Sequence, residues 1–185
     1  ARGGSLHDLL EERERLTPGQ TVAVLARVAD ALGSAHRRGV LHGDVKPANI
    51  LFTTDGEPLL GDFGVAQHLV PDRPEEGGVT RHAVEGTTGY VDPELVATGV
   101  HEPRNDVYGL GVVAYLCLTG RLPHPGATGR EVLAAAEAGD HPPLAAVPGV
   151  PAALAAVVES ALARDPAARP GTAEELADGL RRAVS

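Results

Sequence analysis

Residues 41–52 read LHGDVKPANILF, and this stretch decides how the whole chain is interpreted. It contains Lys46, the only Lys among 185 residues, two positions after Asp44 and three before Asn49. The other fifteen of the 16 Lys and Arg residues are Arg. A chain that uses Arg for nearly every positive charge keeps one Lys here, so we expect a specific task for its compact ammonium group.

The polar side chains around Lys46 fit one kind of chemistry. Asp62 follows Asn49 after two short predicted strands, and a hairpin that folds back brings Asp62 to the loop that holds Asp44. Asn49 and Asp62 then offer the hard oxygen ligands that Mg²⁺ prefers beside phosphate oxygens. Asp44 is left to accept a proton from a hydroxyl, and Lys46 to neutralise a transferring phosphoryl group. These residue types therefore favour phosphoryl transfer.

The rest of the chain predicts a mainly α fold with a small β-hairpin, in one domain or one lobe of a larger one. Thr17, Pro18 and Gln20 form the start signal of a long helix, which is expected to end before Gly39. The polar stretch 65–103, rich in Gly, Pro and Thr, is expected to be a loop. The predicted helices are 5–14, 18–38, 106–119, 128–138, 151–163 and 173–183, and the predicted hairpin covers ILFT and EPLL.

Composition excludes several classes of protein. The formal net charge is −9 and no basic run exceeds two residues, so we expect no nucleic-acid partner. The lone Cys117 excludes an internal disulfide and a cysteine zinc site. No apolar run reaches the roughly 18 residues that a membrane span needs. We therefore expect a cytoplasmic chain, and a membrane anchor outside this segment is compatible with it.

Five segments of the chain resemble the protein kinase family. HGDVKPAN (42–49) resembles the catalytic loop H-R-D-x-K-x-x-N, and DFG (62–64) is similar to the magnesium motif. GTTGYVDPE (86–94) resembles the substrate-binding segment that ends in A-P-E. DVYGLG (106–111) resembles the start of the buried central helix, and RDPAARP (164–170) the segment whose Arg pairs with the A-P-E glutamate. The motifs occur in the family's order, and the nearest subgroup is the eukaryotic-type (Hanks-type) bacterial serine/threonine protein kinases.

The resemblance implies that residues 1–185 are a protein kinase C-terminal lobe with catalytic loop 42–49, activation segment 62–94 and a central buried helix near 106–119. ATP and Mg²⁺ are the implied cofactors, and the implied partner is a protein substrate that presents Ser or Thr. The implied roles are Asp44 as catalytic base, Lys46 at the γ-phosphate, Asn49 and Asp62 as Mg²⁺ ligands, Leu51 on the adenine pocket floor, and Thr87 between base and hydroxyl.

The resemblance also implies supporting contacts inside the lobe. Glu94 is expected to form an ion pair with Arg169, and Asp106 is expected to bind the backbone of the catalytic loop. His42 and Phe63 are expected to stack beneath the active site.

Two departures from the family pattern lead to further expectations. Gly43 stands where many members have Arg, so phosphorylation of Thr80 or Thr88 is not expected to be the activating switch. The N-terminal lobe is absent from this chain, which has no Gly-rich loop and no strand lysine. We expect a truncated protein whose full-length form supplies that lobe, and little phosphotransfer by residues 1–185 alone.

Two other functions stay open. Aminoglycoside-type phosphotransferases share H-G-D-x-x-x-x-N, yet they usually lack a Lys at the place of Lys46 and a Thr-rich segment that ends in Pro-Glu. A pseudokinase-like binding scaffold would need no catalytic side chains, whereas this chain keeps Asp44, Lys46, Asn49 and Asp62. Both alternatives fit the sequence less well than a protein kinase lobe.

Overall fold

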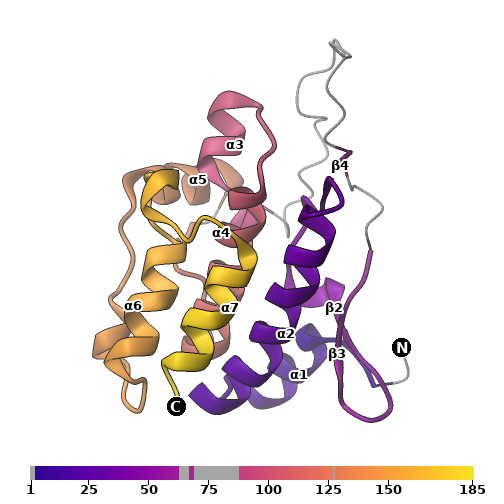
Figure 1. The fold of residues 1–185 in the computed structure, drawn as a ribbon. Helices are drawn as coiled ribbons and strands as arrows, with labels where there is room; N and C mark the ends of the chain where they lie inside the picture. The colour runs from indigo at the N-terminus through magenta and orange to yellow at the C-terminus, as the bar shows by residue number, and fades with distance from the viewer. Residues whose placement is uncertain (1–2, 63–66, 69–87, 127) are drawn as a thin grey trace.

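The computed structural model describes residues 3–62, 67–68, 88–126 and 128–185, and it confirms a mainly α fold with a small β-hairpin (Figure 1). The helices are α1 (Leu6–Arg13), α2 (Pro18–His36), α3 (Pro93–Thr98), α4 (Pro103–Thr119), α5 (Gly129–Ala138), α6 (Ala152–Ala161) and α7 (Ala173–Arg182). The strands are β1 (Val40–Leu41), β2 (Ile50–Phe52), β3 (Pro58–Leu60) and β4 (Gln67–His68).

The helix α2 begins where its sequence signal predicted. The Gln20 amide donates to Thr17 Oγ1 at 3.3 Å, and the Thr17 amide donates to Gln20 Oε1 at 3.1 Å. This reciprocal capping box satisfies amides that the first turn of a helix leaves without partners. Pro18 occupies the first turn, where its missing N–H costs nothing.

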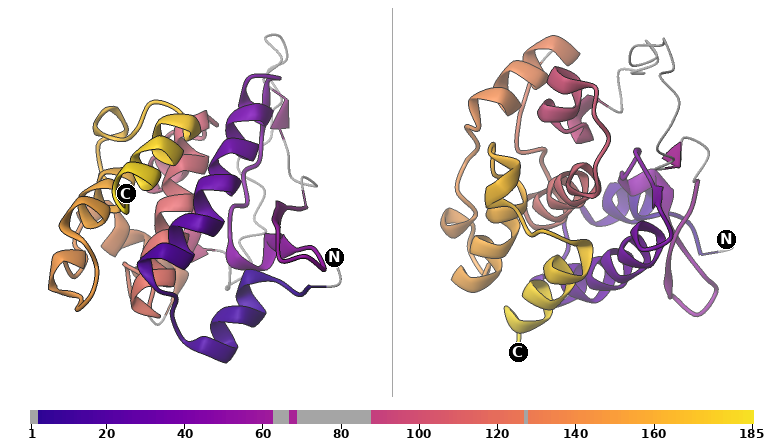
Figure 2. Two further views of the ribbon diagram at one scale, coloured as in Figure 1. Left: turned by 60° about the horizontal axis from the view of Figure 1, so that its bottom comes forward. Right: turned by 45° about the horizontal axis from the view of Figure 1, so that its top comes forward.

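The helix α4 is the centre of the molecule. Figure 2 shows it between α2, α6 and α7, which all contact it. Its residues are buried on every side, as its nearly uniform apolar sequence predicted. It begins at Pro103, three residues before the predicted start, because Glu102 caps it in a box with Asn105. The core that forms around α4 joins α1, α2, α6 and α7 into one cluster.

The helices α2 and α7 lie side by side (Figure 1). Apolar side chains of α7, including Leu176 and Leu180, are buried in the core. Exposed ion pairs at the rim of this contact join Arg181 to Asp30 and Arg37 to Glu174. Since exposed ion pairs contribute little, apolar packing is the main stabilising interaction between the two helices.

The predicted hairpin is present. β2 and β3 pair antiparallel with Ile50 opposite Leu60 and Leu51 opposite Leu59. After β3 the chain returns to the start of the hairpin, where the Gly61 amide donates to the Asn49 carbonyl at 2.8 Å. This return brings Gly61, the residue before Asp62, to the end of the segment 42–49 that precedes the hairpin. A second antiparallel pair, β1 with β4, was not predicted.

The prediction of a loop over 65–103 was wrong for Gln67–His68, which forms β4, and for Pro93–Thr98, which forms α3. Asp92 caps this helix by accepting from the Glu94 amide at 3.0 Å, and Gly99 ends it with φ of 70°. A six-residue helix shows no repeated apolar stripe, so its sequence was read as a loop.

Candidate active site

Asp44, Lys46 and Asn49 meet at one point. Asp44 Oδ2 lies 2.7 Å from Lys46 Nζ and accepts from Asn49 Nδ2 at 3.0 Å. Asn49 Nδ2 also donates to the Asp44 backbone carbonyl at 2.8 Å. The 3₁₀ turn Pro47–Asn49 makes these contacts possible, because it folds the chain back within five residues. Three of the predicted site residues are therefore in direct contact.

The second carboxylate oxygen of Asp44 is different. Asp44 Oδ1 is buried and accepts no hydrogen bond from any residue that the structure describes. A buried carboxylate oxygen without a hydrogen-bond donor is unfavourable, because it has lost its hydrogen bonds to water and no protein group replaces them. A hydrogen bond from an added hydroxyl group would satisfy it.

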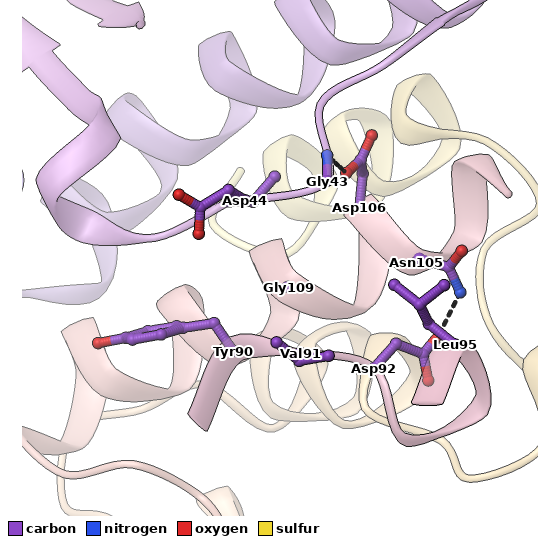
Figure 3. A pocket seen from close by; sticks show the side chains of 10 residues that line it. Gly43, Asp44, Tyr90, Val91, Asp92, Leu95, Asn105, Asp106 and Gly109 are labelled. Carbon is purple, nitrogen blue, oxygen red and sulfur yellow. Dashed lines mark hydrogen bonds between the residues drawn. The ribbon is translucent and has the colours of Figure 1, made fainter. Parts of the chain in front are cut away.

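Asp106 holds the backbone of the catalytic loop. As expected, its Oδ2 accepts from the His42 amide at 2.9 Å. Its Oδ1 accepts from the Gly43 amide at 2.8 Å (Figure 3). His36 Nε2 lies 2.7 Å from the same Oδ2, and both side chains are nearly inaccessible to water. This use of His36 was not predicted, because it depends on where α4 lies relative to the end of α2.

His42 connects the catalytic loop to the residues before Asp62. Its Nδ1 accepts from the Asp44 amide at 3.2 Å, and its Nε2 donates to the Gly61 carbonyl at 2.9 Å. These partners require the neutral ring with its proton on Nε2. The ring therefore orients the backbone on both sides of the site, and its buried position agrees with the expectation for His42.

Asp62 directly follows Gly61, whose amide binds the Asn49 carbonyl, and it is exposed and adopts φ of 56°. Left-handed backbone is uncommon outside Gly, although Asp tolerates it better than most residues. Leu51 is half-buried on β2, and Leu59, its partner across the hairpin, is half exposed. Thr87 and Phe63, as well as Thr80, lie outside the described residues.

The oxygen atoms of one Asn and one Asp fit a magnesium ion that is also bound by the phosphates of a substrate. The candidate ligands are Asn49 Oδ1, since Asn49 Nδ2 donates to Asp44, and the carboxylate of Asp62. Across the described ranges, no group of three His, Cys, Asp or Glu side chains has metal-binding geometry. Mg²⁺ is usually held by one or two protein oxygens together with substrate phosphates, so two ligands suffice.

A small cavity of about 20 Å³ separates the catalytic loop from residues 90–95. Its walls include Gly43 and Asp44 on one side and Tyr90 and Asp92 on the other (Figure 3). Burial raises the pKa of Tyr90 to about 12, with a smaller contribution from Cys117. The hydroxyl of Tyr90 therefore stays protonated near neutral pH.

The predicted ion pair between Glu94 and Arg169 was wrong. Arg169 instead binds the carboxylate of Asp92 with both terminal nitrogens, Nη1 to Oδ2 and Nη2 to Oδ1 at 3.0 Å. Asp92 is the buried cap of α3, whereas Glu94, two positions later, is exposed. Side chains two positions apart do not share a face of a helix, so one of them must turn away from Arg169.

The sequence profile of the protein kinase domain matches residues 1–179. Similar curated proteins include the serine/threonine-protein kinase PknL of Mycobacterium tuberculosis, 40% identical over 168 residues, which are 90% of this chain and 41% of PknL. The serine/threonine-protein kinase PkaA of Streptomyces coelicolor is 42% identical over 187 residues, or 97% of this chain and 32% of PkaA. These matches confirm the resemblance carried by the sequence motifs.

The serine/threonine-protein kinase PknK of Mycobacterium tuberculosis is 36% identical over 179 residues, or 96% of this chain and 16% of PknK. The chain thus spans between 16% and 41% of the length of these relatives. Among its described helices, none has the length and apolar character that crossing a membrane requires.

Proposed function

Since the chain belongs to the protein kinase domain family, we propose that residues 1–185 are the lower catalytic lobe of a serine/threonine protein kinase. The reaction is transfer of the γ-phosphate of ATP to the hydroxyl of Ser or Thr in a protein substrate. The observation that carries the proposal is Asp44, whose Oδ2 contacts Lys46 and Asn49 while its buried Oδ1 has no hydrogen-bond partner among the described residues.

Asp44 is the catalytic base in this proposal. Its Oδ1 accepts the hydrogen bond of the substrate hydroxyl and takes the proton as the oxygen attacks. Asn49 holds the other carboxylate oxygen and the backbone carbonyl of Asp44, which fixes the rotation of the carboxylate. Asp106 holds the backbone just before it through Gly43, so the base is positioned from a buried helix.

Lys46 neutralises charge on the transferred phosphoryl group, and its ion pair with Asp44 sets it beside the attacked atom. Asn49 Oδ1 and Asp62 are the proposed ligands of Mg²⁺, which when bound screens the charges of the ATP phosphates. Leu51 is proposed to lie beneath the adenine ring. Thr87 stays a prediction from the resemblance, with the role of bridging base and hydroxyl.

Lys46 is the only side-chain amine in these 185 residues, and it is committed to the transferred phosphate. We therefore propose that a second lobe, beyond these residues, contacts the remaining phosphates of ATP. The half-exposed Leu59 next to the proposed adenine site is compatible with such a covering lobe. Residues 1–185 alone should then transfer phosphate far more slowly than the two lobes together. The compartment proposed for the reaction is the cytoplasm, where ATP is available.

The test compares Asp44→Asn with wild type in the full protein that contains residues 1–185. Transfer of labelled γ-phosphate from ATP to Ser- and Thr-containing peptides is measured at saturating substrate. Asp44→Asn should lower kcat roughly 10²- to 10⁴-fold, because the amide cannot accept the proton. Asp62→Asn should weaken binding of ATP in the presence of Mg²⁺.

The matched control is Asp55→Asn, which makes the same chemical change in the exposed turn of the hairpin. It should leave kcat within about twofold of wild type, as expected for a surface substitution. Wild-type protein that binds ATP with Mg²⁺ but transfers no phosphate would indicate a binding scaffold instead. Equal activity of Asp44→Asn and wild type would refute the role of Asp44.

A further inference from the structure

Asp92 makes an unusually complete set of contacts for one carboxylate. Its Oδ1 accepts from Arg169 Nη2 and from the Glu94 amide, each at 3.0 Å. Its Oδ2 accepts from Arg169 Nη1 and from Asn105 Nδ2, the latter at 2.7 Å. An ionised carboxylate has about four acceptor sites, so Asp92 is saturated.

Arg169 also makes several contacts besides its pair with Asp92. Its Nε donates to the Ala163 carbonyl at 2.7 Å, and its guanidinium carbon lies 4.8 Å from the centre of the Tyr108 ring. The side chains of Arg169 and Asp92 are both 0% exposed. A guanidinium that stacks on an aromatic ring, binds a carboxylate through two nitrogens and is inaccessible to water is held in one position. Among the described residues, none of the contacts that hold Arg169 involves Glu94.

The contact with Asn105 connects this pair to the active site. Asn105 and Asp106 are consecutive residues in the first turn of α4. Asn105 binds Asp92, whereas Asp106 binds the amides of His42 and Gly43. The first turn of the buried helix α4 therefore holds two segments in place. One is the catalytic loop, and the other is the segment that contains Asp92 and leads into α3.

These two segments face each other across the cavity beside Asp44 (Figure 3). The wall opposite Asp44 consists of Tyr90, Val91, Asp92 and Leu95. Because Asp92 is tied to α4 and to Arg169, it determines how far this wall stands from the catalytic loop. A change at Asp92 should thus move the wall without touching the nucleotide side of the site.

We propose that Asp92 is the positioning residue that sets the segment 88–98 against the catalytic loop, and that Glu94 has no part in this. The proposal rests on the proposed function, since the position of this segment affects activity only if a Ser or Thr peptide binds along it. In this kinase the acidic anchor for Arg169 has therefore moved two residues toward the N-terminus, and the Glu of the Asp-Pro-Glu sequence faces outward.

The first test measures coupling in residues 1–185 without nucleotide. Asp92→Asn, Arg169→Gln and their double variant are unfolded in denaturant, beside Glu94→Gln alone and combined with Arg169→Gln. Asp92→Asn should lower the folding equilibrium constant roughly 100-fold or more, since it breaks a buried pair. The double variant should lose much less than the sum of the singles, whereas Glu94→Gln should act within about twofold and additively.

Milder variants keep the test decisive if Asp92→Asn does not fold. Asp92→Glu retains the charge, and Asn105→Ala removes one of the four hydrogen bonds to Asp92. Each should be less stable than Glu94→Gln and should speed amide exchange in 88–98 relative to that in α4. If Glu94→Gln matches these variants, or couples to Arg169→Gln, the proposal is overturned.

The second test separates positioning from stability in the full protein. Variants that fold at the assay temperature should lose roughly 10- to 100-fold in kcat/KM for the peptide while KM for ATP stays unchanged. If the variants only contained less folded protein, the apparent kcat would fall while KM for the peptide and KM for ATP stayed unchanged. This result would overturn the positioning role. Glu94→Gln, the matched carboxylate-to-amide change, should have the kcat, the KM for the peptide and the KM for ATP of wild type.

The two proposals fail in distinguishable ways. Wild-type protein that phosphorylates peptides but shows no coupling between Asp92 and Arg169 overturns this inference alone. Wild-type protein without any phosphotransfer overturns the proposed function and the peptide-binding part of the inference, even where the coupling between the two side chains is measured.

Discussion

The backbone at Gly43 has φ of 76°, and its amide donates to Asp106. Any side chain with Cβ is disfavoured there, so Gly43→Ala should destabilise the protein by about 1 to 2 kcal/mol. Urea unfolding of residues 1–185, followed by circular dichroism, measures the loss of free energy.

Gly19→Ala is the control for Gly43→Ala. Gly19 lies in the first turn of α2, and a Cβ added there meets no atom within 4 Å. Since Ala is the better helix former, this variant should be neutral or up to about 1 kcal/mol more stable. Equal effects of the two variants would show that the left-handed backbone at Gly43 is not what constrains that position.

Single residues also show how far the sequence predicts the site. Asp44, Lys46 and Asn49 were predicted together because a short loop limits how far apart they can lie. The partner of Arg169 was assigned to Glu94 by resemblance, whereas Asp92 binds it. Sequence alone does not say which of two nearby carboxylates faces inward, because that depends on the direction in which α3 leaves the segment.

At the scale of elements, α4 and α6 pack closely because Gly111 has no side chain. A Cβ at Gly111 would lie 2.9 Å from the Cβ of Ala161. Gly111→Ala should therefore destabilise the protein by roughly 1 to 3 kcal/mol, even though Ala favours the helix. Denaturant unfolding measures the effect.

The compensating variant for this packing is Gly111→Ala with Ala161→Gly. It moves the methyl group from α6 to α4 and removes the clash between the two Cβ atoms. The double variant should be more stable than the sum of the two single changes predicts, by roughly 0.5 kcal/mol or more. Strict additivity would mean that the helices separate without cost.

The turn before α5 contains a histidine that should make stability depend on pH. His124 is buried, its Nδ1 donates to the Asp140 carbonyl at 3.1 Å, and its Nε2 has no partner among the described residues. Burial lowers the pKa of His124 below its ordinary 6.5, an effect that the carbonyl partly offsets and that His141 assists. Below about pH 6.5 the unfolded chain binds a proton at His124 more readily than the folded chain does. The free energy of unfolding should therefore decrease as the pH falls below about 6.5.

His124→Asn tests this prediction, because its amide can still donate to the Asp140 carbonyl but does not titrate. Thermal unfolding between pH 5 and pH 8 should show a weaker acid loss of stability than in wild type. The exposed His7 is the control, and His7→Asn should keep the wild-type pH dependence. A steeper acid loss in His124→Asn would contradict the assignment.

The helices that the sequence predicted share two properties. They are long enough for a repeated apolar spacing, and most carry a start or stop signal, such as the Thr17 cap of α2 or the Gly120 stop of α4. The helix α3 has a cap at Asp92 and a stop at Gly99, but its six residues are too short for a periodic pattern, and the two-residue strands β1 and β4 lack both properties. Tertiary contacts rather than local sequence determine these short elements.

For the whole molecule, stability should be distributed unevenly. The core joins five helices into one cluster, whereas α5 contributes only Ala136 as a buried residue within the described structure. Amide hydrogen exchange should therefore be orders of magnitude faster in α5 than in α4, since α5 can open without breaking the core. Equal protection in both helices would show that α5 is held by contacts outside this cluster.

The ion pair between Lys46 and Asp44 has a practical consequence for chemical probing. Reagents that acylate primary amines meet only one target among the side chains of residues 1–185, and it lies 2.7 Å from the proposed base with 23% of its surface exposed. Because the other fifteen basic side chains are Arg, which these reagents do not acylate at neutral pH, an acylated side-chain amine within residues 1–185 can be assigned to Lys46.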